Sequence, residues 1–262
     1  MMTGIIIAGV LIAAVGLFIG IFLGIAGKKF EILVDEKEEK ILEALPGNNC
    51  GGCGYPGCAG LAAAIAKGEE PCNKCPVGGN KVGRIIGDIM GVYVADQKRQ
   101  VAFVQCAGTC EKAPNNYNYY GRLDCAFAYK VPGMGPKACD HGCLGYGNCT
   151  KVCEFDAIHI IDGISVVDKE ACMGCGKCIN ECPFHLITLV PYDAKHIVHC
   201  SSTDIGKKVN EVCSVGCIAC KICEKNCPAD AIHVVDNIAR IDQDKCTQCG
   251  ICAEKCPKHA IL

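Results

Sequence analysis

Cysteine constrains this chain more than any other residue type, because 26 of its 262 positions are cysteine. Cysteine at this density indicates either a disulfide scaffold or a metal scaffold. Disulfide-rich domains are mostly short and secreted, with irregular cysteine spacing, whereas this chain contains the run Cys-x2-Cys-x2-Cys-x3-Cys-Pro three times. The regular spacing favours metal binding by reduced thiols, and therefore a reducing compartment.

Composition excludes one class of function and predicts an unusual core. The formal net charge is −2, from 26 basic and 28 acidic residues, which excludes a nucleic-acid binder that works by bulk positive charge. Residues 1–27 carry no charged side chain and contain much of the 50% hydrophobic fraction. Few large apolar side chains remain for the other residues, so bound metal groups are expected to cross-link the fold.

The N-terminal sequence predicts a transmembrane helix over residues 1–27 and a linker helix over residues 28–45. Residues 4–27 form an uncharged apolar run, and about 20 such residues cross a bilayer. A signal peptide is the alternative, but it would have a shorter apolar region, a basic start and a cleavage site. Lys28 and Lys29 follow the run and no basic residue precedes it. The positive-inside rule therefore places the N-terminus outside the cell and the remaining chain in the cytoplasm.

A four-cysteine domain is expected over residues 46–100, where the sequence reads NCGGCGYPGC and later PCNKCPVGG. Four thiolates suit a [4Fe–4S] cubane, because soft sulfur ligands favour iron–sulfur clusters or zinc over harder metals. Zinc is the alternative, although structural zinc sites usually use two separated CxxC knuckles. Cys72 and Cys75 compete for the fourth position, and Cys75 is preferred because Pro76 follows it. The predicted ligands are Cys50, Cys53, Cys58 and Cys75.

The second half contains an internal repeat with an offset of 74 residues, which predicts tandem ferredoxin domains over residues 138–192 and 193–262. Each copy has two cysteine runs separated by an alternating apolar hairpin, with turns at Asp162-Gly163 and Asp236-Asn237. This layout resembles bacterial two-cluster ferredoxins, in which the fourth cysteine of each run binds the other cluster. Three standard sets are predicted: Cys153, Cys172, Cys175 and Cys178; Cys217, Cys220, Cys223 and Cys256; and Cys227, Cys246, Cys249 and Cys252.

One site in the first copy departs from this pattern, because Tyr146 stands where the second copy has Cys220. Cys139 lies four positions before Cys143 and is the expected replacement. A damaged site or a three-iron cluster is the alternative. The predicted set is Cys139, Cys143, Cys149 and Cys182.

Six cysteines remain outside these five predicted clusters, and three of them lie in a connecting segment expected over residues 101–137. Their spacing resembles that of the neighbouring runs, although free buried cysteines are also ordinary small hydrophobic residues. The order raises the hypothesis of a sixth cubane formed by Cys106, Cys110 and Cys125 with either Cys200 or Cys213, beside the five clusters that are expected. The six are Cys72, Cys106, Cys110, Cys125, Cys200 and Cys213.

No catalytic residue is predicted. The sequence has no P-loop, no GxGxxG that opens a helix after a strand, and no Ser–His–Asp arrangement. His159 and His233 occupy equivalent positions in the two copies, as do His185 and His259, so these histidines are interpreted as architectural. The residues alone indicate a membrane-anchored chain of clusters that carries electrons.

These motifs together resemble the B subunits of Rnf complexes, in the longer form found in anaerobic bacteria. The resemblance covers the apolar N-terminal segment, NNCGGCGYPGC with the later KCPVGG, and GPKACDHGCLGYGNC in the duplicated region. The CGGCGYPGC element is also similar to the iron–sulfur domain of corrinoid proteins. Its position between an apolar anchor and ferredoxin repeats is much more specific for the Rnf family.

The resemblance implies an electron-transfer subunit of an enzyme that couples ferredoxin:NAD oxidoreduction to sodium or proton translocation. Soluble ferredoxin as electron donor, other subunits of the complex and membrane lipid are the implied partners, and no nucleic acid is expected. A polyferredoxin anchor of another membrane enzyme, such as a hydrogenase, and a zinc-rich structural module are the competing interpretations. The expected fold class is α+β, with one N-terminal transmembrane helix, a small four-cysteine iron–sulfur domain, two tandem ferredoxin domains and five [4Fe–4S] clusters.

Overall fold

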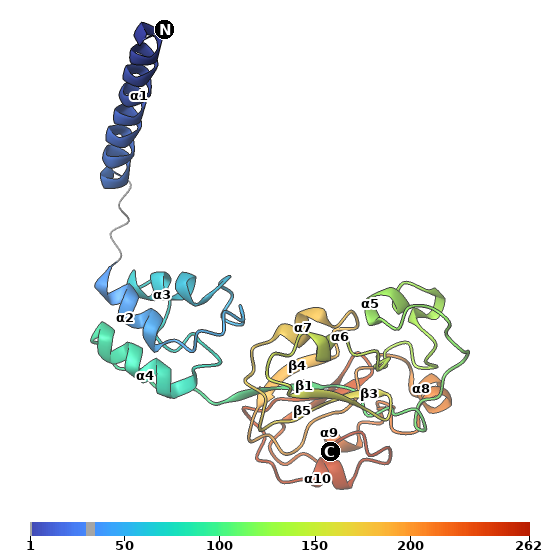
Figure 1. Ribbon diagram of the computed structural model, residues 1–262. Coiled ribbons are helices and arrows are strands. Elements are labelled where there is room, and N and C mark those ends of the chain that lie inside the picture. Colours follow the sequence, from blue (N-terminus) through green and yellow to red (C-terminus); the bar gives the residue numbers. More distant parts are fainter. Residues whose placement is uncertain (1, 30–34) are drawn as a thin grey trace.

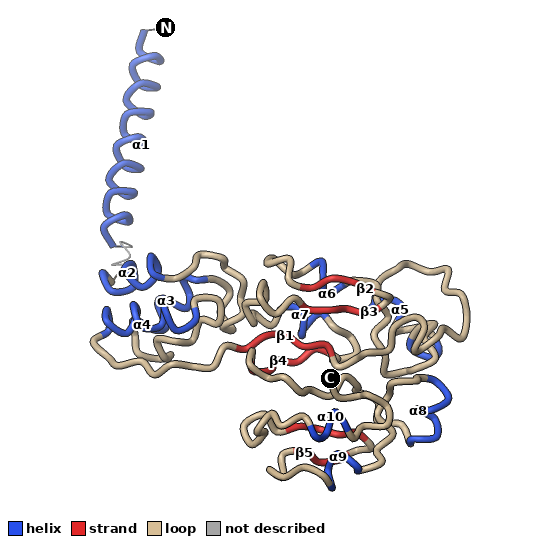
Figure 2. The backbone as a smooth tube through the Cα atoms, turned by 90° about the horizontal axis from the view of Figure 1, so that it is seen from below, coloured by secondary structure: helices blue, strands red, loops and turns tan. Residues whose placement is uncertain are grey.

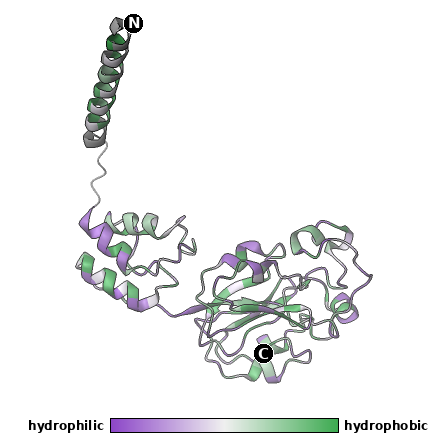
Figure 3. Ribbon diagram, in the orientation of Figure 1, coloured by the Kyte–Doolittle hydropathy of each residue, from purple (hydrophilic) through white to green (hydrophobic). Residues whose placement is uncertain are grey.

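The computed structural model describes residues 2–29 and 35–262, and residues 1 and 30–34 lie outside the described part. Helix α1 (Met2–Lys29) stands apart from the other elements (Figure 1). Figure 3 shows hydrophobic residues along α1, whereas hydrophilic and hydrophobic residues are mixed on the helices that follow. When length and hydropathy are considered together, no helix in the described part of the chain qualifies as a membrane span.

Three helices build the first cysteine-bearing domain: α2 (Glu36–Ala44), α3 (Cys58–Ala66) and α4 (Gly79–Met90). Asp35 precedes α2, and its side chain accepts a hydrogen bond from the backbone N–H of Lys37 at 3.0 Å. An aspartate in this position satisfies an N–H group that the helix itself leaves unpaired. The start of α2 is therefore fixed by its own sequence.

The core of this helical domain consists of large apolar side chains that are at most 1% exposed. Burying each of them contributes about 1.5–3 kcal/mol. Helix α2 packs on both α3 and α4, so the described end of the expected linker over residues 28–45 forms part of this domain. The remainder of that linker includes residues 30–34, outside the described residues. The buried side chains are Ile41, Leu61, Ile65 and Ile86.

Two antiparallel strand pairs organise the first ferredoxin copy. Strand β1 (Gln100–Val104) pairs with β4 (Ile187–Pro191), and β2 (Ile158–Ile161) pairs with β3 (Ile164–Val167). Figure 2 shows the β1–β4 pair between this hairpin and the second copy. The turn residues Asp162 and Gly163 have φ values of 48° and 77°, and positive φ at both positions is typical of a two-residue hairpin turn. The hairpin expected at this position is confirmed.

The second copy repeats the hairpin with β5 (Ile232–Val235) and β6 (Ile238–Ile241). Its turn residues Asp236 and Asn237 have φ values of 52° and 61°. A single bridge between Val198 and Ile261 takes the place of the β1–β4 pair. Ile261 lies 74 residues after Ile187 of β4, so the two copies use equivalent residues for these pairings.

Short helices follow the cysteine loops in both copies. Strand β1 begins at Gln100, so the expected connecting segment over residues 101–137 contributes a strand to the first ferredoxin copy. Helix α5 (Cys125–Ala128) lies in the same segment, and helix α8 (Gly206–Val212) precedes the first cysteine run of the second copy. The short helices are α5 (Cys125–Ala128), α6 (Asn148–Lys151), α7 (Lys177–Glu181), α8 (Gly206–Val212), α9 (Ile222–Lys225) and α10 (Ile251–Glu254).

Cysteines form part of the hydrophobic core of each copy. In the first copy, Cys149 and Cys172 are buried beside large apolar residues such as Ile158. In the second copy, Cys223 and Cys252 are buried in the core, and Cys223 is the counterpart of Cys149. The sulfur atoms therefore face the interior, where a bound metal group would cross-link the loops and strands around it.

Candidate metal centres

All 26 cysteines are free thiols, and the duplicated runs lie on loops that lead into short helices. Gly176 and Gly250 stand immediately before α7 and α10, with φ values of 79° and 81°. Glycine adopts this left-handed backbone without steric cost. The turn at Gly176 brings Cys175 of the loop close to Cys178 of α7, close enough for the two thiols to influence each other's ionisation.

One predicted set in the second copy lines a single cavity. The backbone N–H of Ala260 donates to the Sγ of Cys256 at 3.3 Å. Burial, followed by the neighbouring thiols, raises the pKa of Cys223 to about 11. The structure therefore brings together all four members of this set, Cys217, Cys220, Cys223 and Cys256.

The partner set of the second copy is held by similar backbone contacts. The N–H of Gln248 donates to the Sγ of Cys246 at 3.4 Å, and the N–H of Ala231 donates to the Sγ of Cys227 at 3.3 Å. Burial raises the pKa of Cys252, and the thiols of Cys246 and Cys249 raise it further.

The equivalent set of the first copy shares one of these donors and has one of its own. The N–H of Ala157, the counterpart of Ala231, donates to the Sγ of Cys153 at 3.3 Å, and the N–H of Ala102 in β1 donates to the Sγ of Cys172 at 3.3 Å. Burial raises the pKa of Cys178 to about 12, with further contributions from neighbouring thiols. These neighbours include all the other members of the predicted set, Cys153, Cys172 and Cys175.

At the site with the Tyr146 substitution, the structure gathers a different thiol from the expected one. Cys125 lines the cavity at this site, whereas Cys139 lines a different cavity. Burial raises the pKa of Cys125, and two thiols of this cavity add to the rise. The four thiols that share it are Cys125, Cys143, Cys149 and Cys182.

Cys125 reaches this site because the chain between β1 and Cys139 folds back against α6. Asp124 caps α5, and its carboxylate accepts hydrogen bonds from the N–H groups of Ala126 and Phe127. The N–H of Cys125 donates to the Oδ1 of Asn148 in α6 at 2.8 Å. These contacts hold the start of α5 beside the cavity.

A hydroxyl group that the sequence analysis missed also lies at this site. Ser165 is 4% exposed, and its Oγ lies 3.1 Å from the Sγ of Cys149 and 3.6 Å from the Sγ of Cys143. Its backbone N–H donates to the Sγ of Cys143 at 3.4 Å. The counterpart of Ser165 in the second copy is Ala239, so the comparison of the two hairpins was the available signal.

In the helical domain, Cys75 lies with the thiols expected to join it. Burial raises the pKa of Cys75, and the thiols of Cys53 and Cys50 add to the rise. The N–H of Gly78 donates to the Sγ of Cys75 at 3.3 Å. Cys53 and Cys58 pack against the same core cluster as Cys75.

The remaining cysteine of this domain, Cys72, is also buried in the helical core, and burial raises its pKa.

The helical domain and the first ferredoxin copy meet at their cysteine loops. A Cβ atom built on Gly52 would lie 2.5 Å from the carbonyl oxygen of Cys175, so the two backbones are in close contact. The pKa of Cys175 is raised by burial and then by the thiol of Cys50. Within the first copy, Cys149 of one set likewise adds to the raised pKa of Cys178 in the next set. Adjacent thiol sets are therefore close neighbours.

The donor sets fit a polynuclear iron–sulfur group. Among the described residues, no three cysteine, histidine, aspartate or glutamate side chains converge on a point where one metal ion could bind. The thiols instead surround cavities, and backbone N–H groups donate to several of their sulfur atoms. Four cysteine thiolates with N–H donors are the usual environment of a [4Fe–4S] cluster.

Comparisons with known proteins agree with this geometry. The family model described as "Putative Fe-S cluster" matches residues 45–77, and the model described as "4Fe-4S binding domain" matches residues 165–188 and 239–262. These segments contain the predicted cysteines of the helical domain and one complete run from each ferredoxin copy.

Whole-chain relatives extend the match. The chain is 47% identical to the B subunit of the "Na(+)-translocating ferredoxin:NAD(+) oxidoreductase complex" of Acetobacterium woodii, over 94% of this chain and 74% of the relative. It is 43% identical to the B subunit of the "Ion-translocating oxidoreductase complex" of Methanosarcina acetivorans, over 90% of this chain and 89% of the relative. The chain belongs to the B-subunit family of ion-translocating oxidoreductase complexes. A third member of this family, from the "Proton-translocating ferredoxin:NAD(+) oxidoreductase complex" of Clostridium ljungdahlii, is 38% identical over 90% of this chain and 84% of the relative. The resemblance inferred from the sequence is confirmed.

Proposed function

We propose that this subunit accepts electrons from reduced soluble ferredoxin and relays them to other subunits of an ion-translocating ferredoxin:NAD oxidoreductase. The observation that carries the proposal is the contact between successive thiol sets, from Cys50 beside Cys175 to Cys149 beside Cys178. Relatives of this chain are named for complexes that act on ferredoxin and NAD and that translocate sodium ions or protons.

The subunit binds five [4Fe–4S] clusters through the sets described above, which include Cys125 in place of Cys139. When bound, such clusters supply one-electron oxidation and reduction. The ligand sets are Cys50, Cys53, Cys58 and Cys75; Cys125, Cys143, Cys149 and Cys182; Cys153, Cys172, Cys175 and Cys178; Cys217, Cys220, Cys223 and Cys256; and Cys227, Cys246, Cys249 and Cys252.

The protein's own groups prepare these sites. Burial keeps the thiols neutral before binding, as in Cys178, whose pKa is raised to about 12, so ligation releases protons. Backbone N–H donors such as those of Ala157 and Ala231 then offset the negative charge of the bound thiolates. The sequence offers no nucleotide-binding motif, so NAD is expected to react at another subunit.

We further propose that α1 anchors the subunit in the cytoplasmic membrane, with the N-terminus outside and the cluster domains in the cytoplasm. The proposal is supported by the absence of charged residues from positions 4–27 of the sequence and by Lys28 and Lys29 that follow. Large side chains of α1 such as Leu17 and Phe18 are 68% and 72% exposed, and lipid would cover them. Washing membranes with alkaline carbonate tests this placement. We expect the full chain to stay in the washed membranes, and a chain that lacks residues 1–27 to be lost from them.

Affinity purification of the full chain from native membranes, with its partners identified by mass spectrometry, tests the proposed role. We expect the other subunits of an ion-translocating oxidoreductase to co-purify, and the isolated chain to oxidise reduced ferredoxin without binding NAD. Recovery with hydrogenase subunits instead, or tight NAD binding to the isolated chain in calorimetry, would contradict the proposal.

A further inference from the structure

A sixth group of four thiols lines a cavity between the two ferredoxin copies. This cavity is similar in size to the two cavities described above that each contain four thiols. Gly108 stands at its wall, and a Cβ atom there would lie 3.6 Å from two of the thiols, those of Cys106 and Cys213. The four thiols are Cys106, Cys139, Cys200 and Cys213.

The two copies contribute the first pair of thiols to this cavity from equivalent positions. Cys106 lies two residues after Val104, which pairs with Ile187, and Cys200 lies two residues after Val198, which bridges to Ile261. Ile187 and Ile261 are equivalent in the 74-residue repeat. Cys106 and Cys200 therefore occupy equivalent places in the fold.

The other two thiols are equivalent as well. Cys139 and Cys213 are separated by 74 residues, and each lies four positions before the first cysteine of a ferredoxin run. Cys139 and Cys200 are both buried enough that the pKa of each thiol is raised, to about 12 and about 11 respectively. The cavity is thus a pseudo-symmetric site to which each copy supplies two thiols.

Backbone donors repeat the same symmetry. The N–H of Cys143 donates to the Sγ of Cys106 at 3.4 Å, and the N–H of the equivalent Cys217 donates to the thiol of Cys200. The thiols of the ferredoxin-type sets accept N–H groups at similar distances of 3.3 to 3.4 Å. Cys143 and Cys217 each belong to another proposed cluster set, so this cavity lies between two of them.

A buried lysine provides an independent indication of negative charge in the cavity. Lys137 lines it, is 5% exposed, and donates from Nζ to the carbonyl oxygens of Gly108 and Cys143 at 2.5 Å and 2.7 Å. These carbonyl groups carry no net charge, and a buried ammonium group is costly unless an opposite charge compensates it. Burial raises the pKa of Cys106, and the charge of nearby Lys137 offsets part of that rise. Bound thiolates would supply the charge that compensates Lys137.

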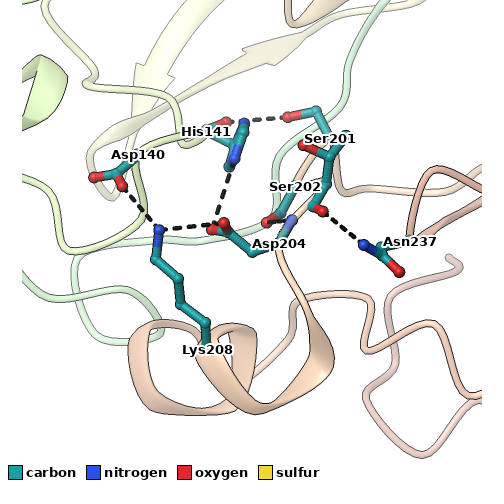
Figure 4. A network of polar contacts seen from close by, with 8 residues as sticks. Asp140, His141, Ser201, Ser202, Asp204, Lys208 and Asn237 are labelled. Atoms are coloured by element: carbon teal, nitrogen blue, oxygen red, sulfur yellow. Dashed lines mark hydrogen bonds and ion pairs between the residues drawn. The ribbon is translucent and has the colours of Figure 1, made fainter.

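Polar contacts hold the two copies together beside this cavity (Figure 4). The Oγ of Ser201 donates to the carbonyl oxygen of His141 at 3.0 Å. The Nζ of Lys208 lies 3.1 Å from Asp140 and 3.2 Å from Asp204. Asp140 and His141 immediately follow Cys139, and Ser201 follows Cys200. The contacts therefore fix the loops that carry one thiol from each copy.

We propose that Cys106, Cys139, Cys200 and Cys213 bind a sixth [4Fe–4S] cluster that links the clusters of the two ferredoxin copies. The four thiols bind as thiolates and release about four protons. This inference rests on the proposed function, because it adds one site to a chain of clusters. It also accounts for the position of Cys139, and six sites of four thiols use 24 of the 26 cysteines, all except Cys72 and Cys110.

Native mass spectrometry and iron analysis of the anaerobic full chain test the number of clusters. Six cubanes predict about 24 iron atoms per chain and five predict about 20. A value of about 20 would overturn the sixth cluster and leave the proposed function intact, whereas a nearly iron-free chain would overturn both. This count does not depend on the folding of any variant.

The double variant Cys200→Ser and Cys213→Ser tests the location, because the five-cluster assignment uses neither thiol. We expect a loss of about four iron atoms per chain and of one component of the reduced-state EPR spectrum, while circular dichroism is retained. Cys110→Ser is the matched control, since Cys110 is exposed and lies outside the residues that line the cavity. Unchanged iron content and EPR spectrum in the folded double variant would overturn the assignment.

Discussion

Replacement of Gly52 by alanine should push the helical domain away from the first ferredoxin copy. The new Cβ atom would lie 2.5 Å from the carbonyl oxygen of Cys175 and 2.9 Å from its Cα. Both are backbone atoms, so neither can rotate away from the methyl group. The φ of Gly52 lies outside the left-handed region, so the contact with Cys175 is the main perturbation.

The size of the effect follows from these distances. Ordinary contacts between carbon atoms need about 3.5 Å, so the two loops must separate by about 1 Å. Forcing a methyl group into a packed contact costs about 1–3 kcal/mol, and here the cost falls on the interface between the two domains. The thiol of Cys50, which adds to the raised pKa of Cys175, should move away from Cys175 with its loop.

Reduced-state EPR and stopped-flow reduction by ferredoxin measure the consequence. We expect Gly52→Ala to weaken the magnetic interaction between neighbouring clusters and to slow electron transfer across the interface, with iron content unchanged. Gly60→Ala is the matched control. It lies in α3 of the same domain, and its Cβ atom would meet Tyr55 at an ordinary 3.6 Å.

The comparison of these two variants decides the question. If Gly52→Ala keeps its iron and matches both Gly60→Ala and the unmodified chain in EPR spectrum and transfer rate, the reasoning is refuted. In that case the contact between Gly52 and Cys175 does not set the distance between the two thiol sets.

Three further predictions concern the clusters and their surroundings. Cys125→Ser should lower the iron content by up to about four atoms per chain, whereas Cys72→Ser should leave the iron analysis unchanged. Ser165→Ala removes hydroxyl contacts to two thiols, and a loss of about 1 kcal/mol should lower one cluster potential by about 40 mV in an EPR redox titration. Ala239→Ser should raise the potential of the equivalent cluster in the second copy. Removal of the clusters with an iron chelator should unfold both ferredoxin copies, and retention of native circular dichroism and protease resistance would contradict this.

Local patterns in the sequence predicted the elements whose residues pair with near neighbours along the chain. The hairpins around Asp162-Gly163 and Asp236-Asn237 were recognisable because alternating apolar residues flank a two-residue turn. The pairing of β1 with β4 was not, because it joins Gln100 to Pro191 across the whole first copy. Nothing in either strand specifies the other at that separation.

The same distinction holds for the thiols. The spacing of a ferredoxin run predicts that its first three cysteines bind one cluster, so local sequence is enough to propose three members of each standard set. The choice between Cys125 and Cys139 depends on how the segment between them folds, through the contact of Cys125 with Asn148. The sequence did contain one indication that the two copies differ here. Cys106 and Cys139 are 33 positions apart, whereas the equivalent Cys200 and Cys213 are only 13 positions apart. The longer segment of the first copy contains Cys125, for which the second copy has no counterpart.

An anaerobic titration of the full chain with reduced ferredoxin tests the central claim, that successive cysteine sets form a continuous path for electrons. The claim predicts uptake of about one electron per cubane, hence about five or six per chain, with bleaching of the visible absorbance and a magnetically coupled EPR spectrum. Uptake of no electrons, or of only one or two by an iron-replete chain, would contradict the account.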